Sequence, residues 1–68
     1  MNTYDVELQY RIEGIHQDHE RISSIAVIKG AACAANAEFI AEMHLWEIAY
    51  DEGWADRLDI ISSQATIR

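Results

Sequence analysis

The chain has 68 residues, of which half are hydrophobic and a quarter are charged, a composition typical of one small folded domain (1–68) and not of a disordered chain. Twelve Asp and Glu residues against five Lys and Arg residues give a formal net charge of −7, which argues against direct binding to nucleic acid or to anionic membranes. The length excludes a doubly wound sheet or a TIM barrel, and no apolar run approaches the roughly 20 residues of a membrane span.

The first predicted element is a strand over residues 3–13, along which polar and apolar residues alternate strictly. A period of two lets a strand bury one face and leave the other in water. Gly14 breaks the pattern, and residues 15–19 are expected to form a loop. The apolar face of this strand would carry Tyr4, Val6, Leu8, Tyr10 and Ile12.

A second strand is predicted over residues 20–29, because the segment is rich in β-branched residues and matches the first strand in length. Three isoleucines in it also recur at a near-helical spacing, so the periodicity alone does not decide. Gly30 separates the segment from an Ala-rich run, which favours the strand. We expect Ser23 and Ser24 to mark a β-bulge where the two halves of the strand change face.

Residues 31–52 predict a helix, because they are rich in Ala, Glu, Met and Leu and contain no proline. We expect the helix to begin between Cys33 and Asn36 and to end at Gly53, a plausible C-cap. Residues 57–67 predict a third strand, with a bulge at Ile60 and Ile61 where the alternation slips.

This order of elements predicts an α+β fold with a two-layer ββαβ architecture. If the first two strands form a hairpin and the helix returns the chain along the sheet, the third strand pairs beside the first. The result is a three-stranded antiparallel sheet with strand order 2-1-3, packed against one helix.

The predicted helix carries two apolar stripes when its residues are placed at about 100° each. We expect the bulky stripe to cover the sheet, because so short a chain needs aromatic area to build a core. The small stripe is then covered by loops or forms the interface of a small homodimeric or adaptor module, although we expect a monomer. The bulky stripe consists of Phe39, Met43, Trp46 and Tyr50, and the small one of Ala34, Ala37, Ala41, Leu45 and Ile48.

Carboxylates are concentrated between residues 38 and 59, where only Arg57 opposes them. A solvated helix normally intersperses lysines among its acidic residues, because like charges held close together repel. Two interpretations remain open: an acidic surface that keeps the protein soluble, and a surface whose field resembles a nucleic-acid backbone and docks on a basic groove. The candidate partner-binding residues are Glu38, Glu42, Glu47, Asp51, Glu52 and Asp56.

The sequence predicts no catalytic site, no metal site and no cofactor. His16 and His19 stand with Asp18 and Glu20 in a short loop, which lacks the rigid frame and the distant ligand of a zinc site. Cys33 lies in an Ala-rich run and is expected to be a small buried thiol. A chain of this size also has little room for a cleft that would desolvate one of two catalytic carboxylates.

Three segments of the sequence resemble the small phage-encoded anti-CRISPR proteins, in particular a type I-C inhibitor: MNTYDVELQYRIEG, AEFIAEMHLWEIAYDEGW and LDIISSQATIR. The resemblance implies a non-enzymatic inhibitor in the cytoplasm of the bacterial host cell. Its partner would be the Cascade surveillance complex, at the basic surface that recognises target DNA. We therefore expect the acidic residues to compete with duplex DNA for that surface.

Overall fold

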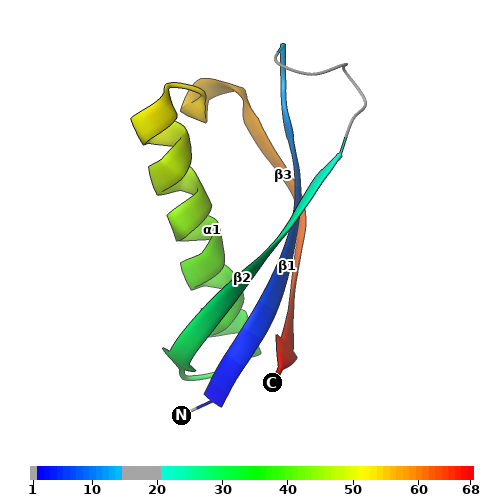
Figure 1. Ribbon diagram of the computed structural model, residues 1–68, viewed down its shortest axis with the longest axis vertical. Helices are drawn as coiled ribbons and strands as arrows, with labels where there is room; N and C mark the ends of the chain where they lie inside the picture. Colours follow the sequence, from blue (N-terminus) through cyan, green and yellow to red (C-terminus); the bar gives the residue numbers. More distant parts are fainter. Residues whose placement is uncertain (1, 15–20) are drawn as a thin grey trace.

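The computed structural model describes residues 2–14 and 21–68. The elements are β1 (Asn2–Ile12), β2 (Ile22–Ala31), helix α1 (Ala34–Glu52), the 3-10 turn η1 (Ala55–Arg57) and β3 (Leu58–Ile67). The three strands form one antiparallel sheet in the order β2-β1-β3, and α1 covers one of its faces (Figure 1). The predicted α+β class, element order and strand order are confirmed. The loop predicted at residues 15–19 lies outside the described residues.

Strand β1 is the central strand, and its apolar and polar residues lie on opposite faces of the sheet, as predicted. Tyr4, Val6 and Leu8 are buried on the face toward α1, and Tyr10 and Ile12 on the same face are partly buried. Among the described residues, no helix covers the opposite face of the sheet, which they leave open to solvent along β1 and β3 (Figure 1). One covered face and one wet face explain the strict alternation of this strand.

Strand β2 departs from the prediction at its bulge and at its end. Its register with β1 runs without a break through Ser23 and Ser24, so the bulge predicted there is wrong. The register shifts instead at Gly30, which has no partner between Lys29 and Ala31 and has a φ of +77°. Glycine adopts this left-handed conformation without a steric penalty, so here it carries a bulge inside the strand instead of ending it.

Strand β3 has the predicted bulge. Its register with β1 shifts between Gln9 and Tyr10, which face Ser62 and Ile60, and this leaves Ile61 without a partner. The slip in alternation at Ile60 and Ile61 is therefore a bulge, as expected. Because the bulge adds one residue, the apolar residues of β3 before and after it lie on the covered side of the sheet.

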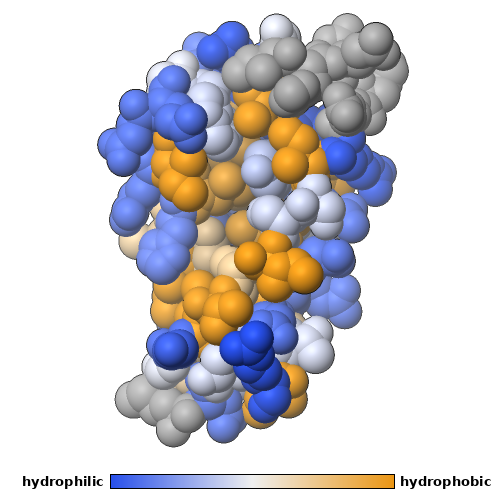
Figure 2. Space-filling model, in the orientation of Figure 1, coloured by the Kyte–Doolittle hydropathy of each residue, from blue (hydrophilic) through white to orange (hydrophobic). Residues whose placement is uncertain are grey.

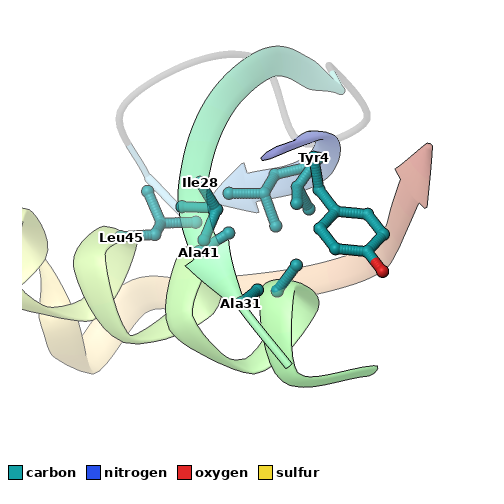
Figure 3. Close-up of a cluster of buried hydrophobic side chains, with 8 residues drawn as sticks. Tyr4, Ile28, Ala31, Ala41 and Leu45 are labelled. Carbon is teal, nitrogen blue, oxygen red and sulfur yellow. The ribbon is translucent and has the colours of Figure 1, made fainter. Parts of the chain in front are cut away.

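The core places small helix residues against large strand residues, so the prediction that the bulky stripe covers the sheet is wrong. The buried residues of α1 are Ala37, Ala41, Leu45 and Ala49. Figure 3 shows Ala41 and Leu45 beside Ile28 of β2, with Tyr4 of β1 near Ala31. Because the sheet supplies the bulk, small side chains on α1 allow the two layers to approach closely.

The start of α1 lies where it was expected, although no side chain of the N-cap residue stabilises it. Cys33 is the N-cap residue and makes no side-chain capping hydrogen bond. Instead, the backbone N–H of Ala32 donates to Oδ1 of Asn36 at 3.1 Å. A side chain in the first helical turn thus reaches back to the preceding segment, as in half of a capping box.

The end of α1 is closed by Gly53, as predicted, in a left-handed conformation with a φ of +84°. The backbone N–H groups of Gly53 and Trp54 both donate to the carbonyl oxygen of Ala49 at 2.9 Å, which satisfies a terminal carbonyl of the helix. Trp54 then stacks on Tyr10 of β1 with ring centroids 6.4 Å apart and an interplanar angle of 2°. The turn after α1 is therefore fixed to the end of the core.

Candidate protein-binding surface

The bulky residues of α1 lie on the side of the helix that faces away from the sheet. Phe39, Met43 and Tyr50 are 54%, 48% and 73% exposed, and Trp46 is partly buried. The rings of Trp46 and Tyr50 lie 6.3 Å apart at an angle of 40°. We call these four residues the outer stripe. Their spacing of four, three and four residues is that of a helix face that docks in a groove.

Carboxylates flank the outer stripe on both sides. At about 100° per residue, Glu38 and Glu42 lie along one side of it and Glu47 and Asp51 along the other. The sequence of α1 contains neither Lys nor Arg. The large apolar side chains are therefore framed by negative charge, and no Lys or Arg stands on the same helix.

Glu38 and Glu42 are tied to the neighbouring strand. The hydroxyl of Ser63 donates to Oε2 of Glu42 at 2.6 Å, and the backbone N–H of Ala65 donates to Oε2 of Glu38 at 2.9 Å. Both carboxylates are partly buried and join α1 to β3. Their role in holding the helix on the sheet leaves them less available to a partner than the exposed carboxylates.

The other four predicted partner-binding residues are exposed but do not share one face. Glu47 and Asp51 lie beside the outer stripe, whereas Glu52 is the last residue of α1 and Asp56 lies in η1. The six residues predicted as one acidic face are thus divided among a flank bound to β3, a free flank and the turn after the helix. Only the two flanks border the exposed aromatic residues.

Among the described residues, the ion pairs of the sheet leave the carboxylates of α1 without a salt-bridge partner. Nη2 of Arg11 lies 3.4 Å from Oδ2 of Asp59, and Nε of Arg68 lies 3.5 Å from Oδ1 of Asp5. Both pairs join β1 to β3 or to the residue after it, and within residues 2–14 and 21–68 no ion pair reaches α1. Exposed pairs of this kind contribute little to stability.

The predicted second interface is not exposed in the folded chain. Ala37, Ala41 and Leu45 are buried against the sheet, and of the small stripe only Ala34 and Ile48 are exposed. A homodimer or adaptor contact through this small stripe would require α1 to leave its own core. The prediction of this interface is therefore wrong for Ala37, Ala41 and Leu45.

An apolar groove that the sequence did not predict lies between α1 and β2. It has a volume of about 370 Å³, and its walls include Ala26 of β2, Ile48 of α1 and Trp54, with His44 and Glu52 among the polar residues. Figure 2 shows hydrophobic side chains gathered in a band along the boundary of α1 and the sheet. No local pattern signals this groove, because its residues come from four separate segments of the chain.

The structure also bears on the residues considered for chemistry. Cys33 is exposed, so the expectation of a buried thiol is wrong; as the N-cap residue it lies outside the packed part of the helix. The described part of the chain contains no group of three or more metal-ligating side chains, while His16, Asp18, His19 and Glu20 lie outside it. Among the described residues, no helix is both long and apolar enough to cross a membrane.

Comparison with known proteins gives no relative: no protein-family model matches the chain, and no curated protein or solved structure is significantly similar to it.

Proposed function

We propose that this protein is a non-enzymatic inhibitor that binds a basic surface of a partner protein through the outer face of α1. The observation that carries the proposal is the outer stripe, which is exposed at Phe39, Met43 and Tyr50 and flanked by carboxylates on a helix without Lys or Arg. Large apolar side chains on a solvent-exposed face mark an interaction surface, because a small domain gains nothing from leaving them in water.

The two parts of this surface would contribute differently to binding. Aromatic side chains such as Trp46 and Tyr50 are the residue types that dominate binding energy when a partner desolvates them. Carboxylates at the rim, such as Glu47 and Asp51, accelerate association with a positively charged surface and exclude partners of the wrong charge. The surface therefore suits a partner with an apolar groove bordered by Lys and Arg.

The resemblance to type I-C anti-CRISPR proteins suggests which partner has this chemistry. The target would be the DNA-recognition surface of a Cascade complex in the bacterial cytoplasm, whose Lys and Arg residues normally neutralise phosphates. One molecule of the inhibitor, occupying that surface, would exclude the duplex by its volume and its charge. A DNA phosphate backbone presents no apolar side chains. The outer stripe would therefore add apolar contacts that DNA does not make, and the protein would bind as more than an imitation of DNA.

A competition experiment with purified type I-C Cascade and labelled duplex DNA tests this proposal. We expect the protein to displace the duplex, with weaker displacement as salt rises, because screening reduces the attraction between exposed charges. Tyr50→Ala should weaken the displacement on the order of tenfold, the effect of losing one aromatic anchor. Ile67→Ala, which shortens an exposed apolar side chain on β3, is the matched control and should displace DNA as the original does.

Absence of displacement at any salt concentration would refute the Cascade assignment. Displacement by Tyr50→Ala that equals displacement by Ile67→Ala would refute the role of the outer stripe while leaving Cascade as the partner.

A further inference from the structure

The two edges of the sheet differ, and the hydrogen bonds show how. The N–H of Arg68 donates to the carbonyl oxygen of Thr3 at 2.9 Å, so the backbone groups of Thr3 point toward β3. Backbone groups alternate in direction along a strand, and those of Val6 therefore point toward β2 and bond to its register partner, Ala26. The next residues on either side, Ile25 and Val27, consequently direct their N–H and C=O groups to the free edge of β2.

The edge of β3 is partly closed by the helix. Ala65 directs its N–H away from β1, and the carboxylate of Glu38 accepts this hydrogen bond. Glu42 holds the neighbouring Ser63 hydroxyl, so two negative charges lie along that edge. Charged side chains placed over an edge strand prevent another strand from pairing with it.

Within residues 2–14 and 21–68, no carboxylate accepts a backbone N–H at the edge of β2; the hydroxyl of Ser23 donates to Oε2 of Glu7 on β1, at 3.5 Å, on the inner side of the strand. No carboxylate occurs between residues 21 and 31, and Ile25 and Val27 are 68% and 44% exposed on the open face of the sheet. On the covered face, Ala26 borders the apolar groove between β2 and α1. A long edge strand with unpaired backbone groups and exposed apolar side chains is a template for strand addition.

We infer that β2 pairs with β2 of a second copy of this chain in an antiparallel dimer. Two molecules with a net charge of −7 repel each other, but residues 21–31 themselves carry no negative charge: their charged side chains are those of Arg21 and Lys29. Antiparallel pairing of a strand with itself is self-complementary, as a two-fold axis requires.

The register of the pairing follows from the side chains. With the two-fold axis at Ala26, Ile25 of each copy lies opposite Val27 of the other, and Lys29 lies opposite Ser23. Each exposed apolar side chain thus gains an apolar cross-strand neighbour, and no like charges face each other. The two sheets become one continuous sheet across the dimer. Because the contact is little more than one strand pair, the dimer should dissociate on dilution.

This dimer is independent of the proposed function. The outer stripe lies on the side of α1 that faces away from the sheet, so edge pairing of β2 leaves it free in both copies. The pairing also differs from the homodimer considered from the sequence, because it uses the sheet edge and not the buried small stripe of α1.

Sedimentation velocity across the micromolar to millimolar range tests the inference. We expect a concentration-dependent dimer for the original chain. Val27→Pro removes an N–H that points to the free edge, where proline is tolerated, and should raise the dissociation constant on the order of tenfold or more. Ile25→Lys keeps every N–H group but places two cations at the pairing site, and should have the same effect. Circular dichroism shows whether each variant keeps its fold.

Ile67→Pro is the matched control, because Ile67 directs its N–H to the free edge of β3. It should dimerise as the original chain does. An original chain that stays monomeric at every concentration, or a dimer that survives in both folded β2 variants, would overturn the inference.

Discussion

At the scale of single residues, the core depends on the match between small helix residues and large strand residues. Leu45 is the largest buried side chain that α1 contributes, and it packs among Ala41 and strand residues such as Ile28. Tyr50, one turn beyond it on the opposite side, has more area but contributes none of it to the core. Side-chain size therefore does not indicate which residues of α1 stabilise the fold.

Two truncations on the same helix test this distinction. Leu45→Ala removes buried methyl groups and leaves a cavity, so it should lower the free energy of unfolding by about 2–5 kcal/mol. Tyr50→Ala, at an exposed position, should change it by less than about 0.5 kcal/mol. Chemical denaturation measures both. A larger loss for Tyr50→Ala than for Leu45→Ala would show that the bulky stripe forms the core after all.

At the scale of the elements, one contact along the side of α1 and one turn at its C-terminal end fix the position of the helix on the sheet. The bond from the N–H of Ala65 to Glu38 fixes α1 to β3, and Gly53 turns the chain from the helix toward η1 and β3. Both features determine where the helix lies and therefore how the outer stripe is presented. Neither is part of the hydrophobic core.

Replacement of Glu38 tests the hydrogen bond that joins the side of α1 to β3. Glu38→Ala leaves the edge N–H of Ala65 without its protein partner and should cost about 1 kcal/mol of stability, the net value of a typical hydrogen bond. Glu38→Gln retains an acceptor oxygen at the same reach and should cost less. Thermal unfolding compares the two. Equal losses for both variants would mean that the charge, and not the hydrogen bond, supplies the stabilisation.

Gly53→Ala tests the turn that ends α1. A Cβ at this position meets no atom within 4 Å, so the expected loss comes from the left-handed backbone alone. That conformation costs a non-glycine residue about 1–2 kcal/mol, and unfolding experiments should show a loss of this size. An unchanged stability would show that the turn after α1 relaxes to another conformation. Gly14, which also has a positive φ and open space around it, gives a matched comparison at the end of the hairpin strand.

At the scale of the whole molecule, the sequence predicts the fold well and the orientation of α1 on the sheet poorly. Strict alternation in β1 and the slip at Ile60 and Ile61 are local signals, so they predict the strand and the bulge correctly. Gly30 misleads, because glycine marks a strand end and a bulge equally well. The orientation of α1 is not a local property, since two apolar stripes fit its periodicity and only the volume supplied by the sheet selects between them.

The acidic residues show the same limit. Their concentration in the sequence predicts an acidic surface, but the tie between Glu38 and β3 depends on a contact between residues 27 positions apart. The size of the outer stripe predicts a place in the core, and no sequence signal distinguishes a bulky core stripe from a bulky exposed one. What the structure adds is that the helix face with the aromatic residues and their flanking carboxylates points away from the sheet.

The most direct test of this account is the affinity for type I-C Cascade of two variants with the same change in net charge. One is Glu47→Lys with Asp51→Lys, beside the outer stripe, and the other is Glu7→Lys with Glu13→Lys, at exposed positions away from α1. We predict that the helix variant loses affinity on the order of a hundredfold or more, while the matched variant loses about tenfold at most. Equal losses for the two variants would contradict the claim that the outer face of α1 is the binding surface.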